Sequence, residues 1–365
     1  TLLASSAASD VYKRQVNDSP QLNPLGVLSV SSRGLDAYMK VFKKWGYQMI
    51  SMDDLIKNNY DETRPYVVLT FDDGFKDNLT VALPILKKYD ARATIFVNPA
   101  YISRKSDEES DWGFMTWDEI RAAINSGVFD IQAHTMTHEF IFTSDKVIDY
   151  YTPDKFIQYY WLAWMLFSES PTQWDSTAME YKNKIPVGYP IFEYGRRLSS
   201  RKFIPSQAYI EYLIHDYCQD GGIGEKAFIG KHGEFETDEA YRAYIYWEVA
   251  ECKRLLEENL GTCVHTLCFP GGGYTEDVLK IAKDSGFRCF MNASRLRQGN
   301  NHDHIRRLHA GEFVGLNRTS FSLIHPGLFP DSVFDYWVAK LSLGSYQNQK
   351  PYGFIKNVMA KLCRR

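Results

Sequence analysis

Residues 66–74 read YVVLTFDDG, and this stretch decides the fold. An uncharged run leads directly into the adjacent carboxylates Asp72 and Asp73 and then into Gly74. A continuous apolar run of this length is typical of a strand that is buried on both faces of a parallel sheet. Parallel sheets and barrels carry their chemistry at the C-terminal ends of such strands. We therefore expect a buried strand that presents two acids at the functional edge of the sheet.

Helices and strands alternate along much of the chain. Apolar residues at helical spacing predict a helix over 35–45 that ends at Gly46, and Thr116 with Glu119 forms a capping box for a helix that ends near Gly127. Further helices are expected over 81–89, 241–260 and 276–285, and further strands over 93–97, 129–133, 266–269 and 288–291. This alternation predicts an α/β fold with a parallel sheet or barrel.

A second motif, HTMTH, occupies residues 134–138 after one of the predicted strands. His134 and His138 are four positions apart, so both imidazoles can reach one ligand if they lie in a helical turn. With Asp73 they make a facial set of three metal ligands, and Asp72 is left as a base for metal-activated water. Zinc is the first expectation for this donor set, while Co²⁺, Fe²⁺ and Mn²⁺ suit the same ligands. Taken alone, each motif also fits an ordinary turn or an ordinary histidine pair.

The composition narrows the class of protein. The chain has 365 residues, 44% of them hydrophobic and 24% charged, which is typical of a globular protein. Its formal net charge of -3 gives no reason to expect nucleic acid or an anionic membrane as a partner. No apolar stretch approaches the roughly 20 residues that a transmembrane helix needs. The six cysteines show no C-x-x-C spacing, so neither a zinc ribbon nor a dithiol redox site is indicated.

The two motifs together resemble a known family. TFDDG at 70–74 followed by HTMTH at 134–138 is similar to the first two motifs of the polysaccharide deacetylases, the NodB-homology or carbohydrate esterase family 4 enzymes. The resemblance extends through Asp77 and Asn78, the segments 93–97 and 117–127, and resumes over 266–290. It implies a distorted (β/α) barrel of about seven units.

The resemblance also implies a reaction. Asp72 would be the general base, and Asp73, His134 and His138 would hold a divalent metal ion, most readily Zn²⁺. The reaction would be hydrolysis of N-acetyl groups on an amino-sugar polysaccharide or oligosaccharide, with an N-acetylated glycan as the partner. The same resemblance points to the cell envelope or the extracellular space, although the residues themselves leave the compartment open.

The later motifs of the family are altered in this chain. Where the family places an arginine that orients the catalytic aspartate, residues 268–274 read CFPGGGY, so that Cys268 stands in its place. Arg306 or Arg307 is a candidate to reach the same carboxylate. Pro270 is expected to form a wall of the site, and Tyr274 is expected to contact the substrate.

The sequence leaves the identity of the general acid undecided. The family's last motif is a leucine, one residue and then a catalytic histidine, and Leu323-Ile324-His325 fits that spelling. His309 is a rival, and a site without either histidine is the third alternative. Without an acid, the rate would fall by roughly 10²–10⁴.

We expect five segments along the chain. Residues 1–15 resemble a translated sequencing-adapter peptide, which we leave out of the predicted fold and which implies that the natural N-terminus is missing. The others are the first half of the barrel (16–139), an aromatic-rich and largely helical insertion on the loop face (140–236), the second half of the barrel (237–325) and a C-terminal extension (326–365).

The insertion has two interpretations. Its aromatic residues could wall a groove for a glycan chain, or they could form a small subdomain packed on itself. The candidates for the groove are Trp161, Trp164, Trp174 and Tyr194.

Two other functions also stay open. One is hydrolysis of a different non-peptide C–N bond on the same fold, which the altered third motif allows. The other is a catalytically impaired carbohydrate-binding protein, against which the intact Asp72 argues.

Overall fold

The computed structural model describes residues 2–5, 7–8, 29–30, 32–102, 114–167, 181–221, 228–292, 304–306 and 308–309. All structural statements below concern these residues. His325 and the extension 326–365 lie outside them, as do Trp174 and Arg307.

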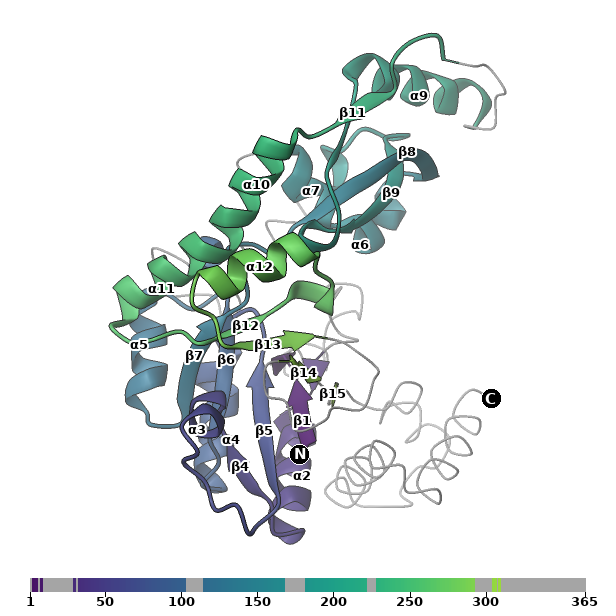
Figure 1. The fold of residues 1–365 in the computed structure, drawn as a ribbon. Coiled ribbons are helices and arrows are strands. Elements are labelled where there is room, and N and C mark those ends of the chain that lie inside the picture. Colours follow the sequence, from purple (N-terminus) through teal and green to yellow (C-terminus); the bar gives the residue numbers. More distant parts are fainter. Residues whose placement is uncertain are drawn as a thin grey trace, which may run out of the picture.

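A parallel sheet of nine strands forms the centre of the molecule (Figure 1). Its order is β14-β13-β12-β7-β6-β5-β1-β15, and β4 pairs with the first half of β5. The strands are β1 (Leu2–Ser5), β4 (Gln48–Ile50), β5 (Tyr66–Phe71), β6 (Ala93–Val97), β7 (Phe129–Ala133), β12 (Thr266–Cys268), β13 (Cys289–Asn292), β14 (His304–Arg306) and β15 (Leu308–His309). The sheet curls into a half-barrel, which confirms the predicted α/β fold class.

The strand that ends at the acidic pair lies inside this sheet. Residues 67–71 of β5 are all buried, because the strand has a neighbour on each side and helices on its faces. Residues 1–15, which we left out of the predicted fold, contribute β1 directly beside β5. That residues 1–15 do not belong to the natural chain stays a prediction.

Helices surround the sheet. They are α2 (Ser32–Lys44), α3 (Met52–Ile56), α4 (Leu83–Lys88), α5 (Trp117–Asn125), α10 (Asp238–Tyr246), α11 (Cys252–Leu260) and α12 (Glu276–Asp284). The capping box of Thr116 and Glu119 at the start of α5 is confirmed. The long helix expected over 241–260 exists, but a π-helical segment, Trp247–Glu251, separates α10 from α11, and Gly261 caps the end in a left-handed conformation.

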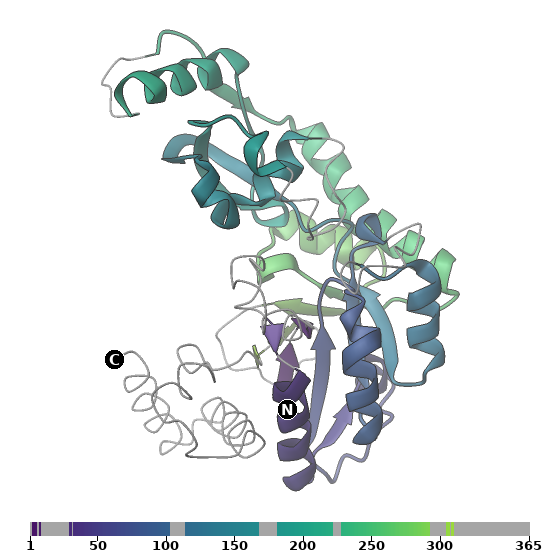
Figure 2. The same cartoon turned by 180° about the vertical axis from the view of Figure 1, so that it is seen from behind.

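The segment between β7 and α10 has a hydrophobic core of its own. It contains the antiparallel pair β8 (Phe140–Tyr150) and β9 (Pro190–Arg196), the short pair β10 (Phe203–Pro205) and β11 (Gly233–Phe235), and the helices α6 (Phe156–Tyr159), α7 (Trp161–Leu166) and α9 (Gln207–Asp220). Figures 1 and 2 show it beyond the end of the sheet at which β5 and β7 finish. The sequence predicted a largely helical insertion and did not predict these strands. The boundaries 140–236 stay a prediction.

Candidate metal centre

The acidic pair lies in a tight turn at the end of β5. Asp73 and Gly74 both adopt left-handed conformations, with φ of 70° and 76°. Side chains of adjacent residues on a continuing strand would point to opposite faces. The left-handed turn breaks this alternation, so both carboxylates reach the same imidazole: His134 Nε2 lies 3.9 Å from Asp72 Oδ2 and 3.6 Å from Asp73 Oδ1.

The position of Gly74 leaves no room for a side chain. A Cβ at this residue would lie 2.8 Å from Val97 Cγ1 on the neighbouring strand, in addition to the strain of its left-handed backbone. We expect Gly74→Ala to lower the free energy of unfolding by about 1–3 kcal/mol, measured by denaturant titration.

Gly46 provides a matched control for this substitution. It has nearly the same φ, 75°, but a Cβ there would meet nothing within 4 Å. Gly46→Ala therefore carries the backbone strain without the clash, and it should cost less than Gly74→Ala. Equal losses would show that the contact with Val97 relaxes freely.

The histidine motif does not form the helical turn that its spacing suggested. Residues 134–139 are an irregular connection from β7 to β8, and Thr135 has a left-handed φ of 65°. The backbone N–H of His134 donates to Val97 O (2.9 Å), and Asn98 Nδ2 donates to the carbonyls of His134 and Thr135. These bonds hold the chain along the sheet edge, and the imidazoles of His134 and His138 are nevertheless 5.2 Å apart between ring centroids.

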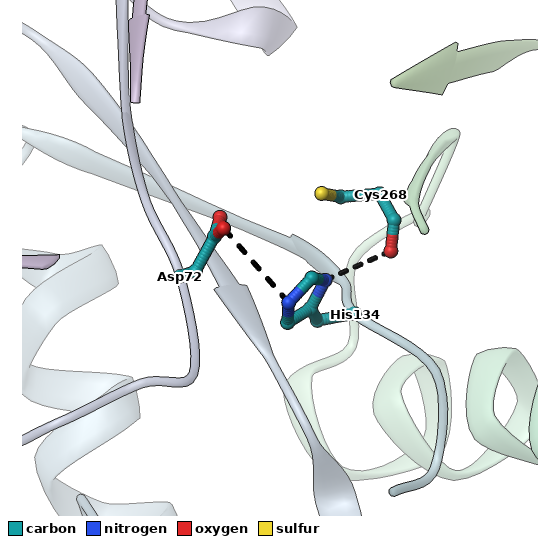
Figure 3. Close-up of side chains that lie close together, drawn as sticks. All are labelled: Asp72, His134 and Cys268. Atoms are coloured by element: carbon teal, nitrogen blue, oxygen red, sulfur yellow. Dashed lines mark hydrogen bonds and ion pairs between the residues drawn. The ribbon is translucent and has the colours of Figure 1, made fainter. Parts of the chain in front are cut away.

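The backbone fixes the orientation of His134. Its Nδ1 lies 2.8 Å from the carbonyl oxygen of Cys268, and because a carbonyl only accepts, Nδ1 carries the proton (Figure 3). The lone pair of Nε2 therefore faces the two carboxylates. A histidine that binds a metal ion is usually oriented in this way, with its second nitrogen bonded to a carbonyl or carboxylate.

The donor set fits a divalent cation. Ligand atoms of Asp73, His134 and His138 all lie within 4.8 Å of one another, which brings together the three residues predicted as ligands. Two imidazoles and one carboxylate are the protein ligands of an open zinc site. Asp72, His134 and Cys268 form a second such group, so the thiol of Cys268 also lies beside the acidic pair.

A buried glutamate that the sequence analysis missed holds the histidine loop. Glu248, in the π-helical segment, accepts hydrogen bonds from the backbone N–H of Thr137 (3.0 Å) and from its hydroxyl. Its own carbonyl accepts from Met136 N (2.9 Å). Burial raises the pKa of Glu248 to about 7, against the hydrogen bonds from Thr137. The signal was present, because Glu248 shares the apolar face of its helix with Tyr241 and Ile245.

We expect Glu248→Ala to weaken metal binding while the protein still folds. The loop that carries His134 and His138 would lose the two hydrogen bonds from Thr137 to the carboxylate, and the loss of such an outer partner typically costs about 10–100-fold in metal affinity. Competition with a chelator measures the dissociation constant. Glu251→Ala is the control, because Glu251 lies in the same segment but pairs with Arg254 at the surface. Equal affinities for both variants would contradict the role of Glu248.

Aromatic side chains border the site on the side of the insertion. The hydroxyl of Tyr101 accepts from His138 N (3.3 Å), and the ring of Tyr101 lies 5.7 Å from that of Trp164 between centroids. Trp161 instead lies in the core of the insertion, 4.6 Å from Tyr194. Of the predicted groove residues, Trp164 thus approaches the site, whereas Trp161 packs internally.

The remaining predicted site residues occupy different places. Pro270 is buried in the turn after β12, and Tyr274 stacks on Phe269 with 4.3 Å between ring centroids. His309 lies in β15 and Arg306 in β14. Substrate contact by Pro270 or Tyr274 stays a prediction.

Comparison with known proteins identifies the segment that carries the acidic pair and the histidines. Residues 59–156 match the family model described as polysaccharide deacetylase. The matched segment is similar to the polysaccharide deacetylase family. It contains Asp72, Asp73, His134 and His138, the residues whose geometry is described above.

One curated relative and two solved structures extend the comparison. The chain is 30% identical over 114 residues to "Putative polysaccharide deacetylase YxkH" of Bacillus subtilis (strain 168), a match that spans 30% of this chain and 38% of that protein. The fold is similar to the BpsB deacetylase domain of Bordetella bronchiseptica (TM-score 0.52, 16% identity, 84% of this chain and 94% of that chain). It is also similar to a de-N-acetylase of Aggregatibacter actinomycetemcomitans (TM-score 0.52, 16% identity, 84% and 92%). At this identity the structural matches show the fold alone.

Within the described ranges, every helix is too short or too polar to span a membrane.

Proposed function

We propose that this protein is a metal-dependent hydrolase that removes N-acetyl groups from an amino-sugar polysaccharide or oligosaccharide. The observation that carries the proposal is the meeting of two carboxylates at one imidazole, which leaves one acid beyond the three ligands a cation needs. The family match over 59–156 and the deacetylase-like fold support it. By the same resemblance we propose a glycan of the cell envelope or an exopolysaccharide, and a location there.

The two acids and the two histidines would have two tasks, metal binding and proton transfer. Asp73, His134 and His138 would hold a divalent cation, which polarises the acetyl carbonyl and lowers the pKa of the attacking water when bound. Asp72 would take the proton from that water on a carboxylate oxygen. The side chain of Asp72 is 19% exposed, so a water molecule can reach its carboxylate.

The leaving amine needs a proton donor, and we propose His325, which lies outside the described residues. His309 is the alternative. The sheet register sets His309 level with Ser5 of β1, and Ser5 level with Thr70 of β5, two residues before Asp72. Its backbone is therefore near the edge of the sheet where the site is found.

An assay of acetate release tests the proposal. The protein, loaded with Zn²⁺ or Co²⁺, is incubated with oligomers of N-acetylglucosamine, and acetate is measured before and after treatment with a chelator. We expect release that the chelator abolishes and added metal restores. If the protein binds both metal and oligomer but releases no acetate, the hydrolase is excluded in favour of a carbohydrate-binding protein. Chelator-sensitive hydrolysis of a non-sugar amide alone would support the other C–N hydrolase.

A further inference from the structure

Arg196, the last residue of β9, brings a guanidinium group to the metal centre from the segment predicted as the insertion. β8 and β9 pair so that Arg196 is level with Phe140, two residues after His138. Its Nη1 donates to His138 Nδ1 at 2.5 Å and to His138 O at 3.1 Å, so that Nδ1 of His138 is the acceptor. The guanidinium carbon lies 3.6 Å from the centroid of the Phe140 ring, which supports it from one side.

The stem of Arg196 lies against the turn that follows β12. A Cβ on Gly271 would lie 3.2 Å from Arg196 Cγ and 3.3 Å from Nε. Gly271 also has a left-handed φ of 63°, so two features favour glycine beside this side chain. Arg196 therefore packs against the turn that follows Cys268. Cys268 is the residue at the position where the family resemblance predicted an arginine.

Arg196 brings a permanent positive charge to the site. The guanidinium group of arginine stays protonated in proteins, and the Asp73 carboxylate is near enough to attract it. A divalent cation bound beside ionised Asp72 and Asp73 would give a net charge of zero, and Arg196 would make the site positive by one unit. Such a site favours one added negative charge.

We propose that Arg196 is a catalytic residue that receives the negative charge developing on the acetyl oxygen and that binds the acetate product. This inference rests on the proposed deacetylation. In that reaction the water oxygen bonds to the acetyl carbon, Asp72 takes a water proton, and the C–N bond breaks as a proton reaches the leaving nitrogen. Acetate keeps the negative charge, and the guanidinium, with donors arranged to suit a carboxylate, is the matching partner.

Two variants and a surface control test this assignment. Arg196→Gln removes the charge, Arg196→Lys keeps it without the planar donor array, and Arg201→Gln alters an exposed arginine that pairs with Asp238. Calorimetric titration with sodium acetate, on protein of verified metal content, measures anion binding without turnover.

We expect Arg196→Gln to retain metal and to bind acetate at least about tenfold more weakly, Arg196→Lys to lie between, and Arg201→Gln to match wild type. On glycan, Arg196→Gln should lose roughly 10²–10³ in kcat with a smaller change in KM. Unchanged acetate affinity, no acetate binding by the wild type, or a parallel loss of metal would overturn the assignment.

A measurement on the wild type covers the case in which the variants do not fold. Protein labelled with ¹⁵N-arginine is titrated with acetate, and a shifted guanidinium signal is expected. Acetate binding without any shift would overturn the assignment. Acetate binding that depends on Arg196, without release from any glycan, would reject only the proposed deacetylation. Normal release by Arg196→Gln would reject only the role of Arg196.

Discussion

Asp72→Asn is expected to leave a protein that binds metal as the wild type does and releases acetate about 10²–10⁴-fold more slowly. Asparagine has nearly the same shape as aspartate, but its amide cannot take a proton from water. The three residues that fit a cation most directly, Asp73, His134 and His138, are untouched by this change. Metal content and the rate of acetate release, measured on the same sample, separate the two functions.

Asp118→Asn is the control for this substitution. Asp118 pairs with Arg121 on the surface of α5, and its side chain is 91% exposed. It should therefore keep full activity. If Asp72→Asn kept its activity, Asp72 would not be the base. If it lost the metal instead, Asp72 would belong to the ligand set, and the second group with His134 and Cys268 would be the better description of the centre.

His134→Ala has the largest expected effect on metal binding. His134 is the one residue common to both candidate ligand groups, and it approaches both carboxylates through Nε2. Its loss should weaken metal affinity by more than the roughly 10–100-fold typical of an outer partner such as Glu248. The variant should also lose activity to the level of chelated wild type.

Thermal unfolding measures this effect without any assay of activity. A ligand that binds only the folded state stabilises it, by about 2.7 kcal/mol at a concentration of 100 times its dissociation constant. The melting temperature of wild type should therefore rise with added Zn²⁺, whereas that of His134→Ala should not. His232→Ala should respond like wild type, because His232 pairs with Asp145 in the insertion. A normal zinc response from His134→Ala would show that the metal binds elsewhere.

The sequence was sufficient for several central strands and helices and for the expectation that the acidic pair and the histidines meet at the sheet edge. The strand ending at Phe71 and the capping box at Thr116 depend on local patterns, and these were predicted correctly. Parallel strands bring their C-terminal ends together, so residues after β5 and β7 could be expected to meet. The prediction of a helical turn at the two histidines was wrong. Thr135 adopts a left-handed conformation there, which a sequence pattern does not specify.

Residues that reach the site from distant segments were beyond the reach of sequence patterns. Arg196 is 58 positions from His138, and only the pairing of β8 with β9 brings the two together. Glu248 is 111 positions from Thr137, although a glutamate on an apolar helix face was a usable signal. Arg306 and Arg307 were the candidates that the sequence offered for the missing arginine; Arg306 lies in β14, and Arg307 lies outside the described residues.

The hydrogen bonds at the sheet edge also couple opening of the site to separation of the strands. Asn98 after β6 bonds to the carbonyl of His134 after β7, and His134 bonds to the carbonyl of Cys268 at the end of β12. Three neighbouring strands are thereby joined by the side chains that orient the centre. Local opening of the histidine loop would break contacts between strands, so the loop should exchange its amide hydrogens as slowly as the core does. Opening of the histidine loop is thereby coupled to the separation of these strands.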